Sequence, residues 1–247
     1  MLQDQPGPEG TGAVTAIPAV PEHVAIVGLG PSAQAYIDLV ERSGGRHAAF
    51  DEVWVINTYG DVLGHDRVFL MDDVANVIRE TTDENIDEKV RAKLSNMLTW
   101  LRTHPGPIYT SLPHSEFPGL VVYPLEDVIN SVGTAYFNNS VAYAVVFAIH
   151  LGVKRISLFG CDYSYGKAMH EGTGRACVEF WLGVAAAKGI HISVAQTSSL
   201  MDANAPERKF YGYEAVDVEV RPLDETRSKV TLTPRKEPLA TMDRENQ

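Results

Sequence analysis

The stretch NNSVAYAVVFAIHLGVKRISLFGCD, residues 138–162, sets two strongly apolar segments on either side of one glycine. Residues 139–152 predict a buried helix, because small and apolar side chains fill the segment and Gly152 stands where helices commonly end. Residues 154–162 predict a buried strand that ends in a run of polar residues. A buried helix followed at once by a buried strand is typical of an α/β domain.

The rest of the chain repeats this alternation. Apolar runs predict strands at residues 23–30, 51–57, 67–73 and 190–196, with short strands at 106–111 and 119–124. Helical spacing predicts helices at residues 31–44, 84–103 and 172–189. We therefore expect an α/β, Rossmann-like, doubly wound and mostly parallel sheet with helices on both faces.

Length and composition suit one such domain with appendages. The chain has 247 residues, of which 45% are hydrophobic, enough for a sizeable core. Residues 23–201 are expected to form the Rossmann-like domain that carries the functional site. The Pro- and Gly-rich residues 1–22 predict a flexible N-terminal arm, and residues 202–247 a polar C-terminal extension that is partly ordered at most.

Charge and cysteine content exclude several classes of protein. A formal net charge of −11 without a basic run argues against general nucleic-acid binding. No apolar run reaches the ~18 residues of a membrane span. Cys161 and Cys177 form no CxxC pair, so neither a disulfide framework nor a zinc site is indicated, and a cytoplasmic location is expected. Oligomers are possible through the apolar residues 141–151 if that helix is exposed.

The carboxyl ends of the predicted strands carry the candidate site residues, since open α/β sheets bind ligands there. In the stretch GLGPS, Gly28 and Gly30 let the backbone approach a ligand, while Ser32 and the amides that follow Pro31 offer donors to an anion. The same glycines also fit a simple tight turn. Read with Ala33 as GxGxxA, they would suggest NAD binding, which remains a minor alternative.

The second predicted strand speaks against NAD, because it ends in Asn57 where an acidic residue is expected. The carboxamide of Asn57, with Thr58 beside it, can read a base, a ribose or a sugar hydroxyl. Capping of a turn is the structural alternative for Asn57.

The segment after residue 160 contains several side chains that could take part in catalysis. Asp162 stands at the strand tip, and Tyr163 and Tyr165 alternate so that both phenols point the same way. His170 follows in a predicted loop, where an imidazole suits proton transfer near neutral pH. The alternative for His170 is a surface histidine at a helix entrance, and Cys161 is best interpreted as a buried thiol.

The motifs VGLGPS, Asn57 after the second strand, and NNSVAYAVVFAIHLGVKRISLFGCDYSYGKAMH together resemble one superfamily over residues 24–200. It joins the bacterial lipooligosaccharide sialyltransferases, the motility-accessory glycosyltransferases and the archaeal 6-hydroxymethylpterin diphosphokinase-like (MptE-like) proteins. The seven residues between Asp162 and His170 make a shorter segment than the sialyltransferase lid, and resemble the latter two branches more closely.

This resemblance implies roles for particular residues. Gly28, Gly30, Ser32 and Asn57 would serve a CMP-sugar, Tyr163 and Tyr165 would assist departure of the phosphate, and His170 would be the base. Other candidates for nucleotide binding are Pro31, Thr58, Asn139, Ser140, Gly160 and Lys167, of which Lys167 is an alternative phosphate contact.

Three functions remain open at this point. The first is a glycosyltransferase with a CMP- or other nucleotide-activated sugar as donor and a glycan or small molecule as acceptor, for which no metal is required. The second is a pyrophosphokinase that uses ATP and Mg²⁺, with Asp72, Asp73 or Asp162 as metal ligands. The third is a nucleotide-binding module without turnover.

Overall fold

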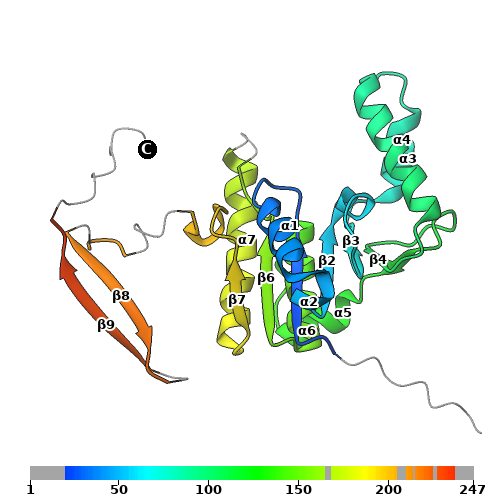
Figure 1. Cartoon of the computed structure of the whole chain (residues 1–247). Coiled ribbons are helices and arrows are strands. Elements are labelled where there is room, and N and C mark those ends of the chain that lie inside the picture. Colours follow the sequence, from blue (N-terminus) through cyan, green and yellow to red (C-terminus); the bar gives the residue numbers. More distant parts are fainter. Residues whose placement is uncertain (1–19, 165–167, 205–209, 214, 225–226, 237–247) are drawn as a thin grey trace, which may run out of the picture.

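The computed structural model describes residues 20–164, 168–204, 210–213, 215–224 and 227–236. They form a seven-stranded parallel sheet with helices on both faces, in the strand order β5-β4-β3-β2-β1-β6-β7, and a separate two-stranded hairpin (Figure 1). The predicted α/β, Rossmann-like fold is confirmed.

The strands of the sheet are β1 (His23–Val27), β2 (Glu52–Ile56), β3 (Arg67–Phe69), β4 (Ile108–Thr110), β5 (Leu120–Val122), β6 (Arg155–Phe159) and β7 (His191–Val194). The helices are α1 (Ala33–Ser43), α2 (Arg46–Ala49), α3 (Val74–Thr82), α4 (Glu88–Thr103), α5 (Leu125–Val132), α6 (Ser140–Leu151) and α7 (Ala168–Ala187). Two 3₁₀ turns, η1 (Asn57–Asp61) and η2 (Leu200–Asp202), complete the main body.

Each central strand contributes side chains to two hydrophobic cores, because successive side chains of a strand point to opposite faces of the sheet. In β1, Val24 and Ile26 join the core formed with α6 and α7, whereas Ala25 and Val27 join the core formed with α1 and α4. Near-continuous apolar strands of this kind are expected where helices cover both faces of a parallel sheet.

Helix α6 is the buried helix that residues 139–152 predict. Asn139 is its N-cap, and its side chain accepts a hydrogen bond from the Ala142 amide. Gly152 follows the helix with a φ of +75°, as its predicted position after the helix end requires. Eight of the side chains of α6 are buried, so most of the surface over residues 141–151, suggested for oligomers if exposed, is covered within this fold.

Several predicted boundaries are wrong. Helices α2, α3 and α5 were not predicted, and α4 begins at Glu88 instead of residue 84. Only the C-terminal half of α4 packs on the core, since Val90 is 45% exposed. Helix α7 already includes residue 170, which places His170 in the first turn of a helix and corrects the predicted loop.

The C-terminal extension contains an antiparallel hairpin of β8 (Val216–Pro222) and β9 (Ser228–Pro234), which pairs with no strand of the main sheet (Figure 1). Its strands alternate apolar and polar residues, and Val220, Val230 and Leu232 are about half exposed. No helix in the described part of the chain is long and apolar enough to cross a membrane.

Candidate functional site

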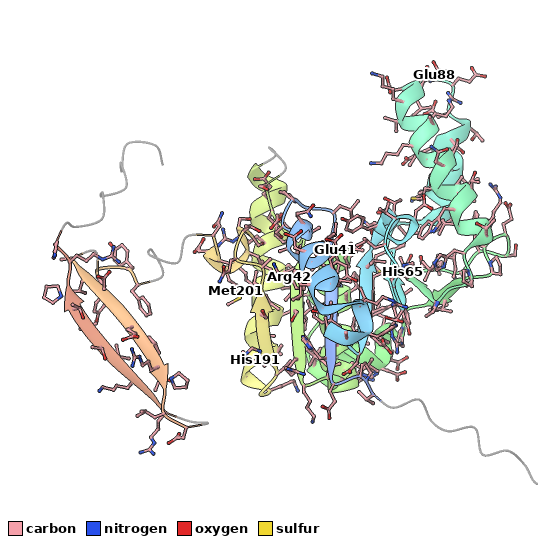
Figure 2. All side chains as sticks on the ribbon, viewed as in Figure 1. Glu41, Arg42, His65, Glu88, His191 and Met201 are labelled. Atoms are coloured by element: carbon pink, nitrogen blue, oxygen red, sulfur yellow. The ribbon has the colours of Figure 1, made fainter. Side chains whose placement is uncertain are left out.

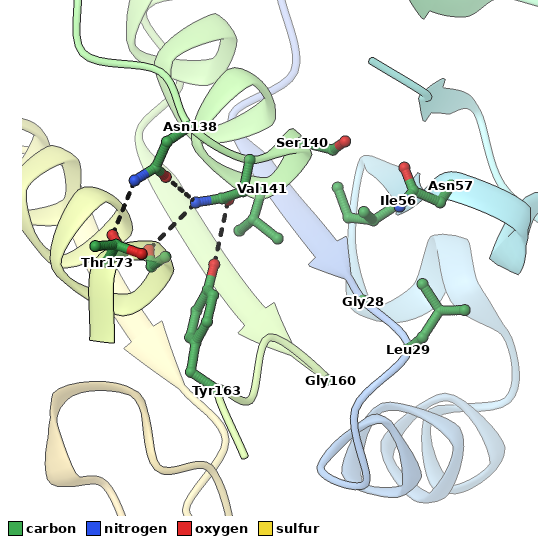
Figure 3. A pocket seen from close by; sticks show the side chains of 12 residues that line it. Gly28, Leu29, Ile56, Asn57, Asn138, Ser140, Val141, Gly160, Tyr163 and Thr173 are labelled. Atoms are coloured by element: carbon green, nitrogen blue, oxygen red, sulfur yellow. Dashed lines mark hydrogen bonds between the residues drawn. The ribbon is translucent and has the colours of Figure 1, made fainter. Parts of the chain in front are cut away.

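A cavity of about 580 Å³, here called the first cavity, opens at the carboxyl edge of the sheet (Figure 3). Its lining comes from the ends of β1, β2 and β6 and from the first turns of α6 and α7. The lining residues are Gly28, Leu29, Ile56, Asn57, Asn138, Asn139, Ser140, Val141, Gly160, Tyr163, Thr173 and Gly174.

The topology of the sheet accounts for this position. Strand β1 is central, with β2 on one side and β6 on the other, so the chain leaves β1 and β6 in opposite directions along the sheet. Such switch points leave a crevice outside the carboxyl ends of the strands, where open α/β sheets bind ligands.

One wall of the first cavity, the glycine wall, consists of Gly28 and Gly160. The backbones of β1 and β6 remain paired past the strand ends, since the Gly28 amide donates to Phe159 O at 2.8 Å and the Gly30 amide to Gly160 O at 2.8 Å. A Cβ on Gly28 would collide with the Gly160 carbonyl, and a Cβ on Gly160 would collide with the Gly28 carbonyl. Gly160 also has a φ of +61°, which favours glycine. The glycines therefore serve close backbone packing.

Ser32 and Asp162 hold the glycine wall in place through hydrogen bonds. The Ser32 amide donates to Asp162 Oδ2 at 2.7 Å, and the Gly160 amide donates to Ser32 Oγ at 2.8 Å. Both side chains are almost fully buried, and a Cβ on Gly30 would lie 2.6 Å from Asp162 Oδ2. The anion at the start of α1 is thus the Asp162 carboxylate of the chain itself, where the sequence suggested an anionic ligand.

Asn57, at the end of β2, combines backbone strain with an unused polar atom. Its φ is +53°, in the left-handed region that costs most residues about 1 kcal/mol or more. Its Oδ1 is buried and has no hydrogen-bond partner in the described structure. The side chain therefore caps no turn through this oxygen, contrary to the structural alternative, and instead lines the first cavity (Figure 3).

The opposite wall, the asparagine wall, consists of Asn138 and Asn139 and ties α6 to α7. Asn138 Nδ2 donates to Thr173 O at 2.9 Å, and Asn139 Nδ2 donates to Gly174 O at 3.2 Å (Figure 3). The Tyr163 hydroxyl donates to Asn139 Oδ1 at 3.2 Å, across the same wall. These bonds fix the first described turns of α7 beside the cavity.

Tyr163 packs against α7 through another glycine. A Cβ on Gly174 would lie 2.7 Å from Tyr163 Cε1, so only glycine leaves room for the ring in this position. The phenol is therefore held at its ring by steric fit and at its hydroxyl by Asn139.

The structure brings together about half of the residues that the sequence suggested. Six of them line the first cavity: Gly28, Asn57, Asn139, Ser140, Gly160 and Tyr163. Five others do not: Gly30, Pro31, Ser32, Thr58 and Asp162. Pro31 precedes α1, which begins at Ala33, and so does not occupy the predicted first helical position.

Three suggested residues lie wholly or partly outside the described structure. Tyr165 and Lys167 fall among the residues that it does not describe. His170 is placed by its backbone in the first turn of α7, while its side chain is not described. Their proposed roles stay predictions.

The alternative metal ligands do not assemble into one group. Asp73 caps α3 by accepting from the Ala75 amide at 2.9 Å, and Asp162 is bound to the Ser32 amide. Neither Asp72 nor Asp73 lines the first cavity. Among the described residues, no group of three or more His, Cys, Asp or Glu side chains is placed to hold a metal ion.

Cys161 is a buried thiol, as the sequence indicated. It is 2% exposed, and burial, with the adjacent Asp162 carboxylate, raises the pKa of the Cys161 thiol to about 12. Because the thiolate is the reactive form, this cysteine is inert near neutral pH.

Sequence reasoning missed half of the cavity lining. The missed residues are Leu29, Ile56, Asn138, Val141, Thr173 and Gly174. Leu29, Ile56, Asn138 and Val141 each stand next to a residue that was named, so their positions carried a signal. Thr173 and Gly174 lie inside the predicted helix at residues 172–189, and no local pattern there marks which helix positions face the cavity.

No protein-family model and no curated protein matches this chain. Among solved structures, it is similar to the sialyltransferase CstII from Campylobacter jejuni in complex with cytidine-5'-monophosphate, with 18% identity and a TM-score of 0.41, over 73% of this chain and 83% of that one. It is also similar to CstII in complex with CMP-3FNeuAc, with 17% identity and a TM-score of 0.40, over 72% and 82% of the two chains. A similarity at this level does not establish a shared activity.

Proposed function

We propose that this chain is a nucleotide-dependent transferase, and most concretely a glycosyltransferase of sialyltransferase-like type that uses a nucleotide-activated sugar. The observation that carries the proposal is Asn57, a strained residue whose buried Oδ1 lacks a donor and which lines the cavity at the switch point. The preference for a CMP-sugar as donor rests on the resemblance of the sequence motifs.

An unpartnered buried acceptor favours a ligand that supplies a donor, since leaving such a group unpaired costs about 1 to 3 kcal/mol. Once the carboxamide turns its Oδ1 into the cavity, the amino group of a nucleobase or a ribose hydroxyl would satisfy it. Strain at a non-glycine residue persists only where the surroundings enforce it, and such residues cluster at ligand-binding sites. Both features of Asn57 are thus accounted for by a bound nucleoside.

We assign the nucleotide phosphate to the start of α6. Asn139, Ser140 and Val141 line the cavity there, and the first amides of a helix attract anions. Figure 3 shows the Ser140 side chain on the side of the cavity that faces Ile56 and Asn57. The start of α1 is not available to the phosphate, because Asp162 occupies the Ser32 amide.

Transfer then requires one bond to form and one to break. An acceptor hydroxyl attacks the anomeric carbon of the sugar, its proton passes to the His170 imidazole, and the bond from that carbon to the phosphate oxygen breaks. Tyr163 would turn its hydroxyl from Asn139 toward the departing phosphate and stabilise the developing charge. No step needs a metal ion, and no observation on the described residues favours the ATP- and Mg²⁺-dependent alternative.

Thermal shift with CMP, CDP, UDP and ATP, each with and without Mg²⁺, tests the choice of nucleotide, since ligands raise Tm by mass action. We expect metal-free stabilisation by CMP or CDP, in the wild type and in His170→Ala alike. Release of CMP from a CMP-sugar, followed by phosphorus NMR, should be lost in His170→Ala. Stabilisation by ATP with Mg²⁺ alone, or by none of the nucleotides, would overturn the proposal.

A further inference from the structure

A second cavity, of about 510 Å³, lies between α4 and η1 and takes no part in the proposed nucleotide site. Its α4 side is lined by Lys89, Lys93, Asn96, Met97 and Trp100, which recur at helical spacing and so share one face of the helix. The side opposite is lined by Thr58, Asp61 and Val62.

The N-terminal half of α4 carries the lysines beyond the packed core. Figure 2 shows Glu88 at the outer tip of the α3–α4 pair and His65 near its base, on the main body. Met97 and Trp100 are buried, whereas Lys89 and Lys93 are exposed. The second cavity therefore has an apolar floor near the sheet and a cationic rim toward solvent.

The two lysines carry charges that no described acidic side chain pairs with. Neither forms an ion pair in the described part of the chain. Along α4, the positions three and four residues from Lys89 and Lys93 hold no acidic residue. The two are instead four residues apart, a spacing at which like charges destabilise a helix by a few tenths of a kcal/mol. An anionic ligand would neutralise this pair, in a chain whose net charge is −11.

The remaining lining suits a sugar. Asp61, Thr58 and Asn96 offer acceptors and donors to hydroxyl groups, and the ring of Trp100, with Met97 and Val62, offers an apolar surface. Gly60 makes this floor possible, because a Cβ there would lie 2.7 Å from Trp100 Cζ2. Asp61 would repel an anion on its own side, so the acidic group of a ligand is directed toward α4.

The second cavity adjoins the first through one short turn. Asn57 lines the first cavity, and the next residue, Thr58, lines the second. A ligand in each would therefore contact η1 from a different side.

We propose that the second cavity binds an acidic saccharide, the class of acceptor for the transfer, with its carboxylate or phosphate between Lys89 and Lys93. The assignment as acceptor rests on the proposed function. The binding of an acidic sugar does not, and can be tested alone.

The test uses saturation-transfer NMR on the full chain with glucuronic acid and with glucose, two sugars that differ in one carboxylate. We expect binding of glucuronic acid at least about 10-fold tighter than that of glucose. This preference should vanish in Lys89→Ala/Lys93→Ala and persist in Lys154→Ala/Lys188→Ala, which removes the same charge from exposed positions elsewhere. Inorganic phosphate should compete more weakly than glucuronic acid, because it cannot engage Asp61 and Trp100.

Equal binding of both sugars, or equal loss in both double variants, would overturn the assignment. Titration of the α4 double variant with CMP separates the two proposals. CMP affinity should be unchanged there, whereas failure of CMP to bind the wild type would count against the nucleotide site alone. The double variant should melt no lower than the wild type, since it removes a like-charge pair.

Discussion

The two walls of the first cavity are held in place by different means. The glycine wall, Gly28 and Gly160, is fixed by backbone atoms that approach so closely that no side chain fits between them. The asparagine wall, Asn138 and Asn139, is fixed by side-chain hydrogen bonds to the backbone of α7. The comparison indicates that the first wall tolerates no added atom, while the second tolerates changes that preserve its donors and acceptors.

The largest effect is expected on the glycine wall. Gly160→Ala should lower the free energy of unfolding by about 3 kcal/mol or more, because the new methyl meets the Gly28 carbonyl and φ is positive. Gly133→Ala is the matched control, since Gly133 also has a positive φ but has open space around it. Its cost should be about 1 kcal/mol. Equal costs in urea unfolding would mean that the close approach is unimportant.

The next effect separates the two functions of Asn139. Asn139→Ala removes the cap of α6 and the link to α7, and should cost about 1 to 2 kcal/mol of stability. Asn139→Asp retains the acceptor for the Ala142 amide and should unfold near the wild-type urea midpoint. If the aspartate variant is as unstable as the alanine variant, the link to Gly174 dominates over the cap.

A smaller effect is expected at Gly174, which leaves room for the Tyr163 ring beside the asparagine wall. Gly174→Ala should displace the Tyr163 ring and weaken CMP binding by roughly 10-fold, measured by calorimetric titration. Gly172→Ala, in the same helix but facing open space, should keep CMP affinity and raise stability by up to about 1 kcal/mol. Unchanged affinity in both variants would remove Tyr163 from the site.

The smallest effect concerns the dependence of stability on pH. It should not involve either wall of the first cavity, because the described lining holds neither a histidine nor a carboxylate. Burial lowers the pKa of His104, with a further contribution from His65, and the His104 Nδ1 accepts from the Gly106 amide. The unfolded chain therefore binds this proton more readily. The contribution of the neutral His104 to the free energy of unfolding should be fully present above about pH 6.5 and be lost as the pH drops below it. Urea midpoints should fall less steeply with acid in His104→Gln, and an equal slope would contradict this assignment.

The sequence predicts the sheet well because its central strands are nearly continuous apolar runs, which a doubly covered sheet buries. Val24 to Val27 and Ile156 to Phe159 are buried on both faces, as their composition requires. Helices α3 and α5 are short and were missed. The β8–β9 hairpin was missed as well, although the alternation in VDVEVRP and SKVTLTP carried a signal that the polar composition of the extension obscured.

The site was predictable mainly where it follows from strand ends, although Asn139 and Ser140 at the start of α6 were also named. Gly28, Asn57 and Gly160 were named because parallel strands present their carboxyl ends at one edge. The mutual fit of Gly28 and Gly160 arises between residues far apart in the chain, and no local pattern reports it. The same holds for the bond between Ser32 and Asp162, which converted an expected ligand contact into a structural one.

Titration of CMP in the absence of divalent metal, followed by calorimetry on the wild type and on Asn57→Gly, tests the central claim most directly. Glycine relieves the strain at a φ of +53° and removes the unpartnered Oδ1, so the unliganded variant should be no less stable than the wild type. We predict that the wild type binds CMP and that Asn57→Gly binds it at least about 10-fold more weakly. Equal affinity in the two proteins, or no binding by the wild type, would contradict the account.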